Sequence, residues 1–278
     1  MEFEKYEIGE SVIYNADCFD VLPTLQDGII SHVCSDFPYG ITHHTWDKVP
    51  PLDKTWKLLE AKAKDNANYV LFGAGGFTID LINSKRDWFR YRLTWVKNNK
   101  TNWLNSGRMV HSNTEDVMIF GKPGHQRTAV FNVPEGFPHP CSALVFNHDR
   151  ANNQQGVNFH NTQKPLRLMA YLLMLYTNPG DLILDSFAGS GSTLVAALKL
   201  GRRFIGIEKE RSFYEIACRR LYEAYQQKYA RRRTTMMTFP VDPANDNQTE
   251  SEIESAIPTA SAPEQQNFED PKPMEELQ

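Results

Sequence analysis

Apolar runs that stop at Asp, Asn or Gly alternate with stretches of helical periodicity over most of this chain. We expect strands at about 11–14, 29–34, 69–72, 91–97, 116–120, 182–185 and 204–207. We expect helices at about 18–25, 52–64, 77–85, 165–176, 193–200 and 211–231. Strands and helices that alternate at this spacing predict an α/β fold with a doubly wound, mostly parallel, Rossmann-like sheet.

Two segments depart from this pattern. From 121 to 161 the periodicity disappears and Pro, Gly, Asn, Gln, His and Arg dominate, which indicates an inserted functional segment. From 234 to 278 large apolar residues are few and Pro, Ser, Thr and Glu are frequent, so we expect a disordered tail. The sequence therefore predicts one folded domain, 1–233, followed by the tail.

Charge is divided unevenly between these two parts. The tail, 234–278, has ten acidic residues and one basic residue, a net charge of −9. Residues 1–233 have 29 basic and 24 acidic residues, a net charge of +5. A mildly basic body suits a polyanionic partner such as nucleic acid.

Composition favours a cytoplasmic protein. No apolar stretch approaches the roughly 20 residues that cross a bilayer, and the first residues lack the basic and apolar regions of a signal peptide. The four cysteines are scattered, with no CxxC pair and no histidine at metal-ligand spacing. We therefore expect reduced thiols and no metal site.

The apolar run at 29–34 leads to the tetrapeptide Asp36, Phe37, Pro38 and Tyr39. An acid, a rigid X-Pro turn and an aromatic ring at the mouth of a buried strand can grip the exocyclic amine of a flat base. Asp36 would accept one N–H, the carbonyl of Phe37 would accept the other, and Tyr39 would stack on the base. Such a tetrapeptide can also simply end a strand, so this interpretation needs support from elsewhere.

That support comes from the glycines Gly189 and Gly191, which stand between the strand at 182–185 and the next helix. Glycine there lets the backbone approach a ligand at the carboxyl edge of the sheet. Glu208, at the end of the following strand, is placed to hold two ribose hydroxyls.

The residues around these glycines narrow the range of possible ligands. Leu194 replaces the third glycine of a dinucleotide fingerprint, and no Lys-Ser/Thr pair follows to make a Walker phosphate loop. Asp185, just before the turn, would repel a pyrophosphate. It suits S-adenosylmethionine, which carries a sulfonium and an ammonium group.

At this point the chain resembles the amino-directed DNA methyltransferases of the permuted β type, over roughly residues 12–221. The catalytic tetrapeptide comes first and the cofactor glycines come last, as in that family. The other matching motifs are Trp95-Val96-Lys97-Asn98-Asn99, Glu115-Asp116-Val117-Met118-Ile119-Phe120 and Thr162-Gln163-Lys164-Pro165-Leu166.

The resemblance implies a Rossmann-like methyltransferase domain that uses S-adenosylmethionine to methylate double-stranded DNA. Together with the residues around the glycines, it gives the expected cofactor-binding residues as Asp17, Lys164, Asp185, Phe187, Gly189, Gly191, Thr193 and Glu208. Among these, Lys164 would lie near the cofactor carboxylate, and Asp17 would either contact the adenine of the cofactor or cap a helix. No covalent intermediate is required, so Cys34 is expected to be a core residue.

Two features of the tetrapeptide refine this expectation. Phe37 stands where the family usually has Pro, which reduces rigidity and offers another aromatic contact. Asp36 stands where cytosine-N4 members usually carry Ser, which favours adenine N6 as the target. The alternatives are a cytosine-N4 methyltransferase, a protein-glutamine methyltransferase and a non-catalytic DNA-binding module.

The insertion at 121–161 is expected to read the DNA sequence, because Arg, Asn and Gln side chains pair with base edges in the major groove. Its candidates are His125, Gln126, Arg127, His148, Asp149, Arg150, Asn152, Asn153, Gln154 and Gln155. The loop at 43–47 is expected to close over the flipped base, with packing of Trp46 as the alternative. The resemblance is compatible with a homodimer, and the sequence does not indicate a restriction endonuclease partner.

Overall fold

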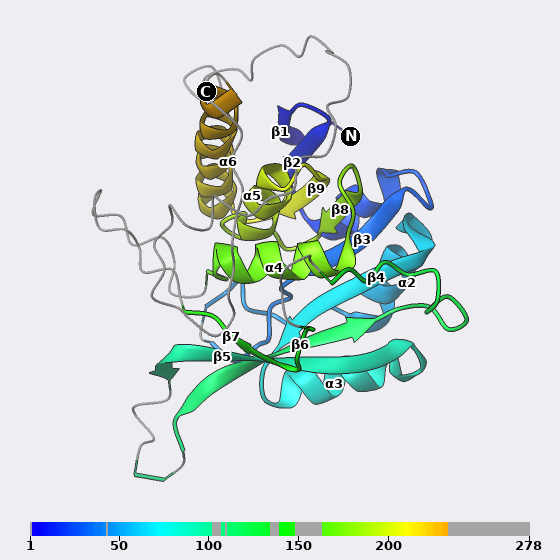
Figure 1. Cartoon of the computed structure of the whole chain (residues 1–278), viewed down its shortest axis with the longest axis vertical. Helices are drawn as coiled ribbons and strands as arrows, with labels where there is room; N and C mark the ends of the chain where they lie inside the picture. The colour runs from blue at the N-terminus through cyan, green and yellow to red at the C-terminus, as the bar shows by residue number, and fades with distance from the viewer. Residues whose placement is uncertain are drawn as a thin grey trace.

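In the part of the chain that the structure describes, nine strands form one sheet (Figure 1). This computed structural model describes residues 2–42, 44–101, 107–108, 110–133, 139–147 and 163–232. The strands are β1 Glu4–Ile8, β2 Ser11–Asn15, β3 Ile30–Ser35, β4 Ala63–Gly73, β5 Phe89–Thr101, β6 Ser112–Phe120, β7 Ala143–Val145, β8 Leu182–Asp185 and β9 Arg203–Glu208. The helices are α1 Cys18–Val21, η1 Leu22–Thr24, α2 Leu52–Lys62, α3 Gly76–Ser84, η2 Arg86–Trp88, α4 Leu166–Tyr176, α5 Ser192–Lys199 and α6 Arg211–Arg232.

The strand order of this sheet is β1-β2-β9-β8-β3-β4-β6-β5-β7. Strands β2, β9, β8, β3 and β4 run parallel, while β6 is antiparallel to both of its neighbours. From β8 the chain crosses to β9 on one side, and from β3 it crosses to β4 on the other. The order therefore reverses between β8 and β3, and open α/β sheets bind their ligands at the carboxyl ends of the strands at such a point.

Each face of the sheet has its own hydrophobic core, because successive side chains of a strand point to opposite faces. On β4, Val70 and Phe72 pack with α4, α5 and α6. The intervening Tyr69 and Leu71 pack with α1, α2 and α3. Helices thus cover both faces, and the predicted doubly wound fold is confirmed.

Most predicted elements match the observed ones within one or two residues. The helix expected at 18–25 divides into α1 and the 3₁₀ turn η1, since Pro23 lies in the first turn of η1. Strand β4 begins six residues before the predicted start at Tyr69. Strands β1 and β7 were not predicted: β1 is an edge strand, and β7 has only three residues.

The predicted insertion is partly built into the sheet. Strand β7 lies within it and pairs in parallel with β5, with Thr94 opposite Ala143. Of the insertion, the structure describes 121–133 and 139–147, and the predicted acidic tail at 234–278 lies outside the described residues. No helix among the described residues is long and apolar enough to span a membrane.

Candidate active site

A cavity of about 490 Å³ opens where the strand order reverses. Its walls come from the segments that follow β2, β3, β8 and β9 and from the approach to α4. Most of the sequence-predicted site residues line it, namely Asp17, Asp36, Phe37, Pro38, Tyr39, Lys164, Asp185, Phe187, Gly189, Thr193 and Glu208. The exception is Gly191, which lies next to the lining residues Ser190 and Ser192 and close to Ala217 of α6. The fold thus brings the tetrapeptide and the glycine turn to one place.

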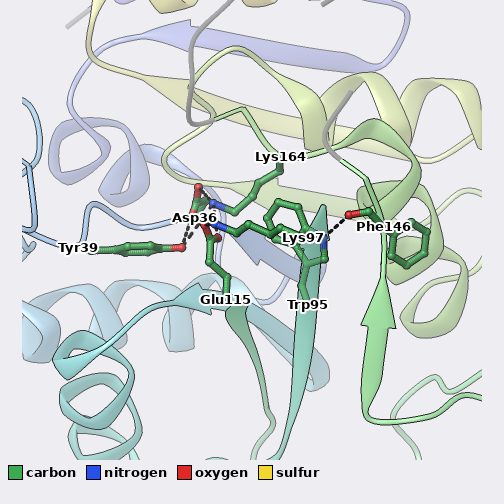
Figure 2. A network of polar contacts seen from close by, with 7 residues as sticks. All are labelled: Asp36, Tyr39, Trp95, Lys97, Glu115, Phe146 and Lys164. Carbon is green, nitrogen blue, oxygen red and sulfur yellow. Dashed lines mark hydrogen bonds and ion pairs between the residues drawn. The ribbon is translucent and has the colours of Figure 1, made fainter. Parts of the chain in front are cut away.

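Asp36 follows the last residue of β3, and its side chain is 30% exposed. The Tyr39 hydroxyl donates to Asp36 Oδ1 at 2.6 Å, and Lys164 Nζ donates to Oδ2 at 2.5 Å (Figure 2). Burial raises the pKa of the Asp36 carboxyl, against the opposing charge of Lys164. Because each carboxylate oxygen can accept more than one hydrogen bond, both can still accept from a ligand.

The ring of Tyr39 stacks on Phe77 from α3, with centroids 5.2 Å apart and planes inclined by 24°. The Tyr39 ring also lines the cavity. Burial, and then the Asp36 charge, raise the pKa of the Tyr39 hydroxyl. The hydroxyl therefore stays protonated and keeps donating to Asp36.

Lys164 joins Asp36 to a second carboxylate, that of Glu115 on β6. The Lys164 ammonium lies 3.1 Å from Glu115 Oε2, and Glu115 pairs in turn with Lys97 on β5 (Figure 2). Lys97 lies over the ring of Trp95, 5.0 Å from its centroid. Burial acts to lower the pKa of Lys164, but the two carboxylates outweigh it and raise that pKa.

Lys164 was expected near the cofactor carboxylate, and in the structure its ammonium is engaged by Asp36 and Glu115. Glu115 and Lys97 were not predicted as site residues. Each is a charged residue next to an apolar strand segment, but the contacts of Glu115 with Lys97 and Lys164 depend on how the fold places β5, β6 and the approach to α4.

Phe37 packs in the core beneath the tetrapeptide, where its side chain is 2% exposed. Its ring meets Phe187 edge to face, with centroids 5.2 Å apart. Phe187 belongs to the glycine turn, so the aromatic contact anticipated from the sequence ties the tetrapeptide to the cofactor segment.

Two buried acids stand on the cofactor side of the cavity. Asp185 accepts from Ser35 Oγ at 2.8 Å and from the Phe187 amide at 3.2 Å. Glu208 accepts from the amides of Gly189 and Glu210, each at 2.7 Å. Burial raises the pKa of Asp185 to about 6 and that of Glu208 to about 7.

Asp17 has the capping role that the sequence left as one alternative. Its Oδ1 accepts from the Phe19 amide at 2.9 Å at the start of α1, and its Oδ2 pairs with Lys209 at 3.0 Å. Asp17 also lines the cavity. Burial acts to raise the pKa of Asp17, but these two partners outweigh it and lower that pKa.

The glycine turn has a shape that other residues would disturb. Gly191 has φ +80°, and a Cβ there would lie 2.9 Å from Ala217 Cβ on α6. Arg220 of α6 clamps the same turn, since its guanidinium donates to the Ser190 carbonyl at 2.5 Å and to Ser190 Oγ at 3.1 Å. Arg220 has no distinguishing signal in the sequence, because only the fold brings this helix against the turn.

The loop after the tetrapeptide is organised by Asp47, which accepts from the amides of Gly40, Ile41 and Thr42 at 2.7–3.0 Å. Trp46 packs edge to face on Phe213 of α6, with centroids 5.9 Å apart. This is the packing alternative for Trp46. His43 lies outside the described residues, and among those described no group of three or more His, Cys, Asp and Glu could hold a metal ion.

Part of the expected DNA-reading segment lies far from the cavity. Residues 121–133 follow β6 at the amino end of β4, where Lys122 pairs with Asp65 at 2.7 Å and Asn66 donates to the Thr128 carbonyl. Asp65 lies eight residues before Gly73, or about 26 Å at ~3.3 Å per residue. His125, Gln126 and Arg127 therefore lie at the opposite edge of the sheet from Asp36, because β6 runs antiparallel and returns the chain to that edge. Their assignment as base readers stays a prediction.

The remaining base-reading candidates, His148, Asp149, Arg150, Asn152, Asn153, Gln154 and Gln155, lie outside the described residues. The described residues on either side of them are anchored to the domain. The Phe146 carbonyl accepts from Trp95 Nε1 of β5 at 2.8 Å, and Gln163 lines the cavity. Their assignment stays a prediction.

This chain is similar to known proteins. The profile of the N6/N4 DNA methylase family matches residues 30–219. The type II methyltransferase M1.MboII of Moraxella bovis is 26% identical over 241 residues, which cover 70% of this chain and 90% of that protein.

Solved structures of other proteins share the fold of this chain. The M1.HpyAVI–SAM complex superposes with a TM-score of 0.57 at 25% identity, over 75% of this chain and 97% of that one. The PvuII cytosine-N4-specific DNA methyltransferase superposes with a TM-score of 0.67, over 83% of this chain and 96% of that one. At 19% identity it supports the fold alone.

Proposed function

This chain belongs to the N6/N4 DNA methylase family, and on that basis we propose that it transfers a methyl group from S-adenosylmethionine to the N6 amine of a flipped adenine in double-stranded DNA. Its membership makes it an S-adenosylmethionine-dependent DNA methyltransferase of the N6/N4 class. The finer proposal is the target atom and the residues that act on it. The observation that carries it is the Asp36 carboxylate, partly exposed in the same cavity as the glycine turn.

The cavity residues fit S-adenosylmethionine. The buried acids Asp185 and Glu208 offer negative charge and hydrogen-bond acceptors to a cationic ligand that carries ribose hydroxyls. The positive φ at Gly189 and Gly191 lets the turn bend beside the cavity. When bound, the cofactor would supply an electrophilic methyl group, and the sulfonium sulfur that carries this group would become a neutral thioether.

We assign the handling of the target amine to the tetrapeptide. The base must leave the duplex, because its amine is unreachable in the stack. Asp36 and the Phe37 carbonyl would accept the two N–H groups and free the nitrogen lone pair for in-line attack. After transfer the nitrogen must lose one proton, and Asp36 is the acceptor at that position. Tyr39 would stack on the base, which is worth ~1–3 kcal/mol per base in single-strand complexes.

Adenine is favoured over cytosine by Asp36 itself, because the family resemblance assigns Ser to this position in cytosine-N4 members. Recognition of the DNA sequence is proposed for the part of the insertion that follows β7, since β7 pairs with β5 and the chain reaches the cavity again at Gln163.

Incubation of the purified protein with methyl-labelled S-adenosylmethionine and unmethylated DNA tests the proposal. After digestion, mass spectrometry of the nucleosides is expected to find N6-methyladenine. Detection of N4-methylcytosine would overturn only the assignment of adenine N6 as the target. An absence of labelled nucleoside, while the cofactor still binds by calorimetry, would overturn the proposal.

A further inference from the structure

Ion pairs connect four side chains of alternating charge in series, and this line of ion pairs begins at Asp36 in the catalytic cavity (Figure 2). Asp36 pairs with Lys164 at 2.5 Å, Lys164 pairs with Glu115 at 3.1 Å, and Glu115 pairs with Lys97. The four come from the ends of separate segments: after β3, before α4, on β6 and on β5. Such a line is a product of the fold, since only sheet register places β5 and β6 side by side.

Only the first two members reach the ligand space. Asp36 and Lys164 line the cavity, whereas the cavity lining does not include Glu115 and Lys97. The side chains of Glu115 and Lys97 are 14% and 10% exposed. Two charges are thus kept nearly buried without touching a ligand, and a buried charge is costly unless it is paired. Any effect on methyl transfer passes through Lys164.

The line affects how strongly Asp36 accepts a proton. If Asp36 were the sole carboxylate partner of the Lys164 ammonium, the ammonium would keep Asp36 ionised but make its carboxylate a weaker proton acceptor. Glu115 shares that ammonium, and Lys97 in turn shares Glu115. The acceptor strength of Asp36 therefore depends on two residues that stand behind it.

We propose that Glu115 and Lys97 are positioning residues for methyl transfer, which set the balance of the Lys164 ammonium between two carboxylates and thereby the acceptor strength of Asp36. This inference rests on the proposed role of Asp36 as the group that accepts from the target amine.

The surroundings of Asp36 agree with this balance. The ionisable groups that face it are Tyr39 from its own turn, Lys164 from the approach to α4, Glu115 from β6 and Asp185 from β8. Lys164 lowers the pKa of Asp36, and Glu115 raises it. Lys164 and Lys97 together lower the pKa of Glu115 against the effect of burial, so Glu115 stays ionised.

Two variants are expected to move the acid limb of the kcat–pH profile in opposite directions. Glu115→Gln leaves Lys164 to Asp36 alone, so the limb moves down by about 0.5–1 pH unit and kcat at neutral pH falls about tenfold. Lys97→Met releases Glu115 to draw Lys164 away, so the limb moves up by about 0.5–1 pH unit. Merely structural damage would lower kcat without opposite shifts.

Matched variants complete the experiment. Lys97→Arg keeps the charge and is expected to restore the wild-type limb. Glu60→Gln removes one partner of the pair that joins Glu60 on α2 to Lys85, just after α3, and is expected to leave the acid limb unchanged. The inference would be overturned if Glu115→Gln and Lys97→Met still bind cofactor but their acid limbs stay in place or move in the same direction. Failure of the wild-type protein to methylate DNA would instead overturn the proposed function.

Discussion

The two halves of the cavity compensate their carboxylates in opposite ways. In the catalytic half, Asp36 in the cavity and Glu115 behind it face the ammonium groups of Lys164 and Lys97. In the cofactor half, the two buried acids accept from neutral groups: backbone amides for Glu208, and an amide and the Ser35 hydroxyl for Asp185.

This difference indicates the charge of the ligand that each half of the cavity can bind. The catalytic half holds two acids and two lysines, so it is balanced and requires a neutral partner such as an amine. In the cofactor half burial dominates the pKa of Asp185 and of Glu208 and raises both. Uncompensated buried acids bind a cationic ligand favourably, because the ligand supplies the missing charge.

Asp36→Asn is expected to give the largest effect and to separate the two halves. The amide cannot accept a proton from the target amine, so kcat is expected to fall by about 10³-fold. The cofactor half is untouched, so the Kd for S-adenosylmethionine is expected to stay within about threefold of wild type. Single-turnover methylation and calorimetry measure the two quantities. Turnover near the wild-type rate in this variant would remove Asp36 from the mechanism.

Gly191→Ala is expected to damage the cofactor half instead. A left-handed residue other than glycine costs about 1–2 kcal/mol, and the 2.9 Å approach to Ala217 adds an overpacking cost of about 1–3 kcal/mol. The Kd for S-adenosylmethionine is expected to rise at least tenfold, because the turn must shift.

Gly180→Ala is the matched control for that variant. Gly180 has φ +82°, and a Cβ there would meet nothing within 4 Å. Gly180→Ala therefore adds backbone strain without a close contact, at a position outside the cavity lining. Chemical denaturation should show the smaller loss of stability in this control, with the cofactor Kd unchanged. Equal losses in both variants would mean that contact with Ala217 has no role.

Arg220→Met is expected to have a moderate effect confined to the cofactor half. The guanidinium holds the Ser190 carbonyl and hydroxyl, so its loss should loosen the turn. We expect the KM for S-adenosylmethionine to rise about tenfold, the value of one charge-assisted hydrogen bond, with kcat within about twofold. Arg219→Met, on the exposed neighbour in α6, is the control. A fall in kcat at unchanged KM would show that Arg220 acts on the catalytic half.

The sequence predicted the elements that carry strong local signals. Strand β8 was placed to the residue, because its apolar run is bounded by Gly180 and by the turn after Asp185. The tetrapeptide and the glycine turn each stand at the end of such a run. Parallel strands place their carboxyl ends at one edge, so their meeting in one cavity followed from topology.

Long-range partners escaped prediction. The ion pair of Lys97 and Glu115 depends on the register of β5 against β6, and their link to Asp36 joins residues 79 positions apart in sequence. Sequence patterns carry no signal for such pairing. The same is true of His125, whose distance from the cavity depends on β6 running back across the sheet.

The pH dependence of cofactor binding is expected to give an effect no larger than that of Arg220→Met. Glu208 has a pKa of about 7 in the free protein, above its value of 4.5 in an unfolded chain, so it holds its proton more tightly when folded. A cationic ligand favours the ionised form, so binding must release this proton, and affinity should rise from pH 6 to pH 8 and level off above. If binding requires the ionised acid, the rise is about tenfold, the change in the ionised fraction across a pKa of about 7.

The amino group of S-adenosylmethionine also titrates, and Glu208→Gln separates the two contributions. The ligand titrates alike with both proteins, so the difference between their slopes of log Kd against pH belongs to Glu208. Calorimetry in buffers of different ionisation enthalpy counts the released protons independently. Equal slopes in the two proteins would mean that Glu208 is already ionised in the free cavity, and the contrast between a balanced and an uncompensated half would then rest on Asp185 alone.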